Sequence, residues 1–139
     1  MTRGARALVV CPDIRNVSQD LPAEERLAEA IGLAQAIGIV VAESYIQPVR
    51  DVKPATLFGA GQVEQIGVDA EMAEAELIIV DGALSAIQQR SLEETLKRKV
   101  IDRTGLILEI FGERAATAEG RLQVELAHLD YQASRLVRS

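Results

Sequence analysis

Short runs of consecutive apolar residues alternate along the chain with longer segments in which apolar residues recur at every third or fourth position. An unbroken apolar run bounded by turn residues is typical of a strand covered on both faces. We expect such strands at residues 5–11, 39–42, 77–80 and 99–102, with a further short strand at 56–58. The second of these could continue through a polar tail as far as Pro48.

The segments between the apolar runs carry helix signals. Pro22 suits the first turn of a helix, and Gly38 is a natural terminator for that helix. Ser85 and Gln88 fit a capping box, in which the hydroxyl and the amide each bond a backbone N–H at the start of a helix. Further helices are expected at 62–75, at 104–114 and from 117 to the end of the chain.

The alternation of strands and helices predicts an α/β fold, with a small, mainly parallel sheet and flanking helices. The chain has 139 residues, of which 48% are hydrophobic, and this is enough for one core. We expect the α/β domain to occupy residues 1–103. Residues 104–139 are expected to form a helical extension that ends in a long C-terminal helix.

The last predicted helix has apolar residues at heptad spacing. The seam consists of Leu122, Leu126, Leu129, Ala133 and Leu136. Such a seam requires a partner surface. Three partners are open: the sheet of the same chain, a second copy in a homodimer, or a continuation of the chain beyond Ser139. The second would make the chain a structural dimerisation module.

Composition excludes several kinds of chemistry. A single cysteine and a single histidine exclude a disulfide framework, a cysteine-built zinc site and a multi-histidine metal site. Cys11 ends a predicted buried strand, which favours an inert thiol. His128 has no nucleophile or carboxylate at a spacing that would indicate a catalytic pair. We therefore predict no catalytic residues and no metal ligands of this kind. No apolar run is long enough to span a membrane, so a cytoplasmic protein without membrane insertion is expected.

Charge is unevenly distributed. The whole chain carries −6, which argues against a freely basic nucleic-acid binder, but residues 97–139 carry +2. A polyanion such as RNA would therefore meet the C-terminal part. The candidate RNA-binding residues are Lys97, Arg98, Lys99, Arg114 and Arg121. The alternative is a solvated helix surface of mixed charge, on which glutamates balance the basic residues.

Polar or glycine residues follow the predicted strands, and the carboxyl ends of parallel strands are where ligands bind. The candidate nucleotide-binding residues are Gly59, Gly61, Asp81, Asp102 and Arg103. The glycines could cradle a phosphate or simply form a tight turn. The two aspartates could hold Mg²⁺ with a nucleotide or cap the next turns, and Arg103 could pair with either aspartate.

Longer motifs carry a family resemblance. The stretch VIDRTGLILEIF at 100–111, with RAAT at 114–117 and LQVELAHL at 122–129, resembles the N-terminal domain of the HflX-type ribosome-associated GTPases. LFGAG at 57–61 is similar to the glycine motif of that family. This chain departs from the family pattern at Gln62, where the family has lysine, and at Ala83–Ala86. No GxxxxGK[ST] P-loop occurs in the 139 residues.

The resemblance implies an accessory domain. Members of the family hydrolyse GTP, bind the large ribosomal subunit and split stalled ribosomes, and their N-terminal domain contacts ribosomal RNA. GTP and Mg²⁺ would then belong to a downstream GTPase domain, and the last helix here would be half of a helical hairpin. We expect this chain to help bind the subunit and to regulate that GTPase, without catalysis of its own. The resemblance also implies adenine-nucleotide binding or weak ATP hydrolysis, with ATP and Mg²⁺ as the ligand of that alternative.

Overall fold

A four-stranded parallel sheet forms the centre of the computed structural model, which describes residues 4–15 and 21–114. The strand order is β2-β1-β3-β4. The strands are β1 (Arg6–Ile14), β2 (Val40–Val49), β3 (Leu77–Val80) and β4 (Lys99–Asp102). The predicted strands at 77–80 and 99–102 are confirmed at both ends.

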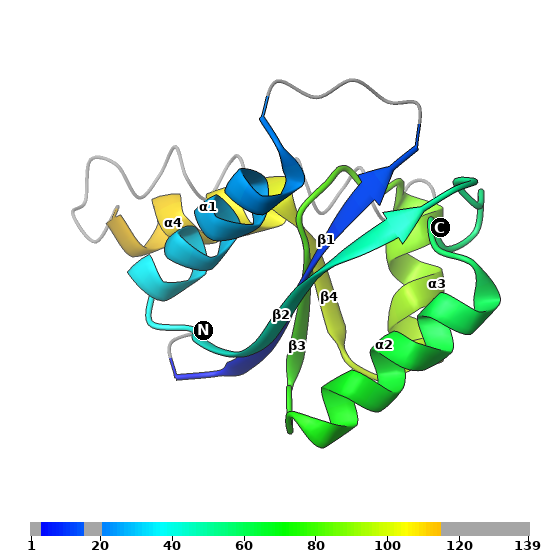
Figure 1. Ribbon diagram of the computed structural model, residues 1–139. Helices are drawn as coiled ribbons and strands as arrows, with labels where there is room; N and C mark the ends of the chain where they lie inside the picture. Colours follow the sequence, from blue (N-terminus) through cyan, green and yellow to red (C-terminus); the bar gives the residue numbers. More distant parts are fainter. Residues whose placement is uncertain (1–3, 16–20, 115–139) are drawn as a thin grey trace.

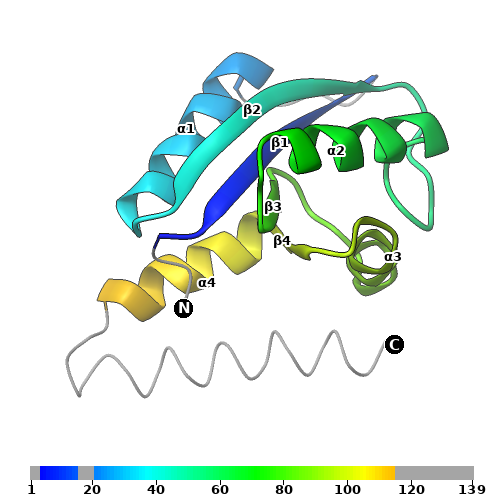
Figure 2. The same cartoon turned by 90° about the horizontal axis from the view of Figure 1, so that it is seen from below.

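Helices cover both faces of the sheet (Figures 1 and 2). On one face lie α1 (Ala23–Ala36) and α4 (Arg103–Arg114), and on the other lie α2 (Ala60–Met72) and α3 (Ala86–Leu96). Each face has its own apolar cluster, because successive residues of β1 point to opposite faces. Val9 belongs to the cluster under α1 and α4, and Val10 belongs to the cluster under α2 and α3. This arrangement confirms the predicted α/β class.

The inner strands are apolar on both sides because both sides are covered. Residues Ala7 to Cys11 of β1 are fully buried, and all four residues of β3 are at most 2% exposed. The capping box is also confirmed: the Ser85 hydroxyl accepts from Gln88 N–H at 3.1 Å, and Gln88 Oε1 accepts from Ser85 N–H at 2.9 Å. Gly38 follows α1 with a φ of +80°, a conformation that glycine adopts without strain.

The expectation of a buried second strand was wrong. β2 is an edge strand whose residues are mostly half-buried, and it runs for ten residues through Pro48. An edge strand tolerates proline because the missing N–H need not face a neighbour. Apolar sequence alone does not distinguish an edge from a centre, since α1 and α2 cover part of each face of β2.

The expected strand at 56–58 is absent. The described residues there form one isolated bridge, between Lys53 and Leu57. Leu57 has a φ of 70°, which extended backbone does not allow. Phe58 nevertheless is fully buried, so its apolar character reflects an anchor of a loop rather than a strand.

Several boundaries differ from the expected ones. β1 continues past Cys11 to Ile14, paired there with β2 alone. Pro22 immediately precedes α1 rather than standing in its first turn. The helix expected at 62–75 runs from Ala60 to Met72, since the chain turns at Ala73 and Glu74 to enter β3.

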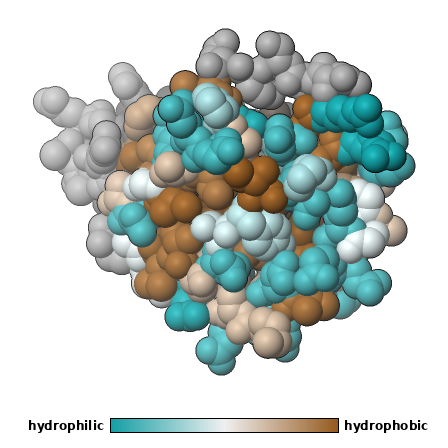
Figure 3. All heavy atoms as spheres, viewed as in Figure 1, coloured by the Kyte–Doolittle hydropathy of each residue, from teal (hydrophilic) through white to brown (hydrophobic). Residues whose placement is uncertain are grey.

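The outer edge of β2 is protected against further strand pairing. Figure 3 shows a mixture of apolar and polar surface in the middle of the view, where β2 lies in Figure 1. Ser44 N–H donates to the Glu43 carboxylate at 3.0 Å, and Pro48 has no N–H. The Pro48 carbonyl accepts from the side-chain amide of Gln62 at 2.9 Å. These contacts occupy groups that an incoming strand would need.

The described part of the predicted extension is α4, which packs on the sheet through Leu106 and Ile110. The leucine seam, Arg121 and His128 lie outside the described residues, so the predicted C-terminal helix and the homodimer through it stay predictions. Among the described helices, none is long and apolar enough to cross a membrane.

Candidate functional site

The chain changes direction across the sheet between β1 and β3. Helix α1 leads from β1 to β2 on one side, whereas α2 carries the chain back to β3 on the other side. The connecting helices therefore diverge and leave a crevice at the carboxyl ends of the two strands. A cavity of about 570 Å³ lies there, lined in part by Arg26, Glu29, Asp81, Gly82, Arg103 and Thr104. We call it the switch-point cavity.

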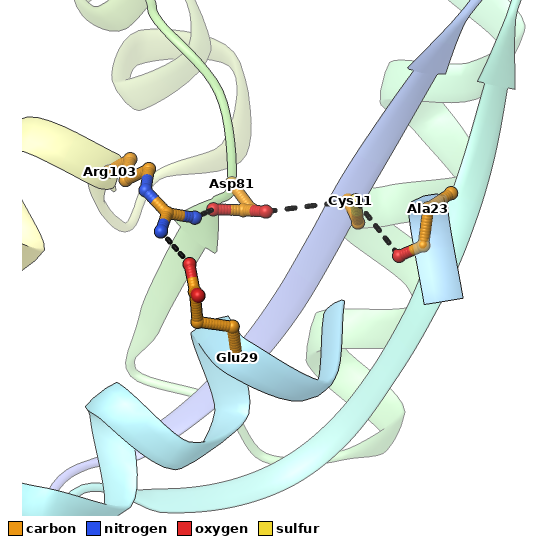
Figure 4. Close-up of polar contacts among 5 residues, drawn as sticks. All are labelled: Cys11, Ala23, Glu29, Asp81 and Arg103. Carbon is orange, nitrogen blue, oxygen red and sulfur yellow. Dashed lines mark hydrogen bonds and ion pairs between the residues drawn. The ribbon is translucent and has the colours of Figure 1, made fainter. Parts of the chain in front are cut away.

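Arg103, the first residue of α4, joins three elements across this cavity (Figure 4). Its Nη1 donates to Asp81 Oδ1 at 2.7 Å, directly after β3. Its Nη2 pairs with the Glu29 carboxylate on α1. Of the two partners that the sequence left open, Asp81 contacts the Arg103 guanidinium.

Asp81 is the buried partner of this network. Its side chain is 2% exposed, and Oδ2 accepts a weak hydrogen bond from Cys11 Sγ at 3.8 Å. Burial raises the pKa of the Asp81 carboxyl, while the positive charge of Arg26 and the Cys11 thiol oppose the rise. The guanidinium of Arg103 at 2.7 Å also favours the carboxylate. Asp81 thus serves as an ion-pair anchor rather than as a turn cap.

Asp102 has the capping role that the sequence left as an alternative. It is 1% exposed, and its Oδ1 accepts from Gly105 N–H at 3.0 Å in the first turn of α4. Its Oδ2 accepts from Leu84 N–H at 3.2 Å, in the loop after β3. This carboxylate fixes the start of α4 and hence the position of Arg103.

The glycine loop is not part of the switch-point cavity. Gly59 precedes α2 on the other face of the sheet, and Gly61 lies in the first turn of α2. Gly59 N–H donates to Gln62 Oε1 at 3.1 Å, and Gln62 Nε2 donates to the Pro48 carbonyl. Gln62 thus closes the loop against β2. The structure separates the two glycines from Asp81 and Arg103, which lie together.

Two cavity residues, Arg26 and Glu29, were missed by the sequence analysis. They look like ordinary surface charges of α1. The available signal was their position: α1 follows β1 directly, and residues three apart in the first turns of such a helix share the face above the strand ends.

Three of the basic candidates lie at the opposite end of the sheet, before and at the start of β4, and Arg114 is the last residue of α4. Lys97 and Lys99 are exposed. Arg98 is held by the Ala75 carbonyl at 2.8 Å and by the Glu71 carboxylate at 2.7 Å. Two of these three cations are therefore available to a polyanion, and Arg98 has a structural contact instead.

A larger cavity, of about 900 Å³, lies between α2 and α3 and away from the carboxyl ends of the strands. Its lining is mainly apolar and includes Val68 and Met72, which are 51% and 81% exposed. No group of three or more metal-ligating side chains occurs within residues 4–15 and 21–114. The carboxylates that line the switch-point cavity, Glu29 and Asp81, contact guanidinium or thiol groups.

Burial raises the pKa of the Cys11 thiol from 9.0 to about 11, with the Asp81 charge adding to the rise and Arg26 opposing it. Folding then favours the protonated thiol. Its contribution to stability is complete below pH 9 and is lost as the pH rises through the folded pKa of about 11.

We therefore expect the free energy of unfolding to fall between pH 9 and 11 more steeply for the wild-type chain than for Cys11→Ala. Urea denaturation at a series of pH values measures this difference. The comparison is needed because burial and the Asp69 carboxylate also raise the pKa of Tyr45. Parallel pH profiles for the two proteins would contradict the assignment.

The fold and this cavity define a doubly wound α/β domain of the class that binds ligands at its switch point. Residues 24–112 match the model of a family described as GTP-binding GTPase N-terminal. The chain belongs to that family, as its resemblance to the HflX-type GTPases indicated.

Curated relatives agree with the family match. The chain is 50% identical to the GTPase HflX of Magnetococcus marinus over 81% of its own length and 26% of the relative. It is 40% identical to the GTPase HflX of Escherichia coli over 82% of its length and 27% of the relative. The chain thus spans about a quarter of the length of these relatives.

A solved structure shares the fold. It is a GTP-binding protein from the archaeon Sulfolobus solfataricus in complex with GDP, with a TM-score of 0.75 and 24% identity. The match covers 96% of this chain and 39% of that protein.

Proposed function

We propose that this chain acts as the N-terminal accessory domain of an HflX-type GTP-binding protein, where it helps to bind the large ribosomal subunit and regulates the GTPase. The observation that carries the proposal is the match of residues 24–112 to the N-terminal family of these GTPases. The matched relatives are GTPases about four times as long as the aligned segment.

The charge distribution supports an RNA contact at the amino-terminal end of β4. Lys97 and Lys99 flank Arg98 and are exposed, on a chain whose net charge is −6. Lysines that neutralise phosphates release counterions from the RNA, so their contribution weakens as salt increases.

We expect the chain to co-sediment with large ribosomal subunits with an affinity that falls steeply between about 50 and 200 mM salt. The double variant Lys97→Glu, Lys99→Glu should bind about tenfold or more weakly, because two phosphate contacts become repulsive. The matched control reverses two exposed cations elsewhere, Arg50→Glu and Lys53→Glu, and should bind like the wild type.

Two results would count against this proposal. One is an affinity for the subunit that does not change with salt. The other is an equal loss of binding in the lysine variant and in the control, which would indicate a general charge effect rather than a contact at β4.

A second candidate function is the binding of an adenine nucleotide, ATP with Mg²⁺. The observation that favours it is the switch-point cavity, which Arg26 and Arg103 line at the ligand position of the doubly wound fold. Arginine is well suited to phosphate groups because its planar donors bind two oxygens at once.

We expect titration of the isotope-labelled chain with ATP and Mg²⁺ to shift the backbone amide resonances of Gly82, Arg103 and Thr104. Those of Gly59 and Gly61, on the other face, should move little. The absence of any shift at millimolar nucleotide would exclude this function, and shifts confined to the glycine loop would move the site there.

A further inference from the structure

Two arginines and two carboxylates line the switch-point cavity, and they differ in how completely their hydrogen-bonding groups are paired. Arg103 has both of its carboxylate partners, Asp81 and Glu29. Arg26 lines the same cavity, and among the described residues its buried Nε has no hydrogen-bond partner. A buried guanidinium nitrogen without an acceptor is unfavourable, so Arg26 has an unused hydrogen-bond donor in the lining of the cavity.

The two partners of Arg103 differ in how firmly they are held. The Asp81 side chain is 2% exposed, whereas the side chain of Glu29 is 44% exposed. An ion pair that faces solvent contributes little to stability because water competes for both groups. Glu29 is therefore the partner that a ligand can replace, while Asp81 keeps Arg103 in place.

We propose that the Glu29 carboxylate occupies the position of a ligand phosphate in the free domain, and that a phosphate-bearing ligand displaces it. The phosphate oxygens then bind the guanidinium groups of Arg103 and Arg26. This inference rests on the second candidate function and adds to it an internal competitor for the same site. The ligand class is a small molecule with a terminal phosphate group, such as a nucleoside polyphosphate.

The displacement has a structural consequence. Glu29 belongs to α1 and Arg103 opens α4, so their ion pair joins the two helices on one face of the sheet. Release of Glu29 removes this link at the end of α4 nearest the cavity, while Asp102 and Asp81 still hold that end to the sheet. Binding of a ligand in the cavity would thus change the contacts at the start of α4, the helix that precedes residues 115–139.

The test measures binding of ATP, inorganic pyrophosphate and adenosine to the full chain by calorimetry. Glu29→Gln removes the competing charge and should bind ATP and pyrophosphate about fivefold more tightly than the wild type. Arg26→Gln and Arg103→Gln should each bind them about tenfold more weakly. Glu24→Gln, an exposed position on the same helix and outside the cavity lining, is the matched control and should bind like the wild type.

The outcomes separate the inference from the function on which it rests. ATP binding that is equal in the wild type and Glu29→Gln would overturn the internal competitor while nucleotide binding stands. Adenosine binding as tight as that of ATP would overturn the phosphate position. Failure of every probe to bind both the wild type and Glu29→Gln would overturn both proposals. Urea denaturation of each variant establishes that it is folded.

Discussion

Replacing Phe58 by alanine should lower the free energy of unfolding of the chain by about 4 kcal/mol. Phe58 is fully buried and is the largest of the fully buried side chains. It packs with β1, β3, α2 and α3 side chains, Leu8, Val63 and Ile78 among the members of its cluster. The alanine variant would lose the buried apolar surface and leave a cavity that the rigid sheet cannot fill. Urea denaturation followed by circular dichroism measures the loss.

Two variants are controls for this prediction. Phe58→Leu keeps most of the volume and should cost less than about 1.5 kcal/mol. Phe111→Ala removes the same side chain from a position that is 51% exposed, and it should cost less than half as much as Phe58→Ala. Equal effects at the two phenylalanines would show that the loop at 53–59 is not anchored as described.

Asp102→Ala should lower the free energy of unfolding by about 3 kcal/mol, because two buried backbone N–H groups lose their acceptor. These groups belong to Leu84, in the loop after β3, and Gly105, in the first turn of α4. The same substitution should weaken nucleotide binding in the switch-point cavity, since the start of α4 sets the position of Arg103. Denaturation and calorimetry on one preparation measure both effects.

Asp102→Asn distinguishes charge from shape. The amide oxygen accepts one of the two bonds, whereas the amide nitrogen faces an N–H donor, so we expect a loss of about 2 kcal/mol. An asparagine variant as stable as the wild type would mean that the two backbone groups find other acceptors.

The inner part of the sheet followed directly from apolar runs. β3 is short and apolar throughout, and β4 is apolar between Lys99 and Asp102, so the limits of both strands were predicted correctly. The start of α3 was predicted as well, because a capping box depends on side chains three residues apart. In these segments the local preference and the packing agree.

The wrong predictions concern segments in which an apolar run is compatible with more than one structural environment. An apolar run is compatible with an edge strand that two helices partly cover, as in β2, and with a loop that anchors a phenylalanine, as at 56–58. Burial acts on side chains and not on backbone pairing. The run therefore indicates that a segment contacts the core, and it says little about how its N–H and C=O groups are bonded.

The candidate site divides in the same way. Asp81, Asp102 and Arg103 were expected at strand ends because a parallel sheet brings such ends to one edge. The choice of partners was not accessible, since whether an aspartate caps a turn or binds an arginine depends on the loops around it. Arg26 and Glu29 were not recognised because on a helix surface a functional charge has the same local pattern as a solvated one.

Local chemistry along the chain thus settled which segments are strands and helices, the layered α/β class and the acidic balance with a basic C-terminal part. Folding in three dimensions settled the strand order, the exposed edge at β2, and the pairing of Arg103 with Asp81 and Glu29. The physical reason is distance along the chain. Periodicity and capping act over a few residues, whereas these pairings join side chains 22 and 74 positions apart, and they exist only once the helices have crossed the sheet.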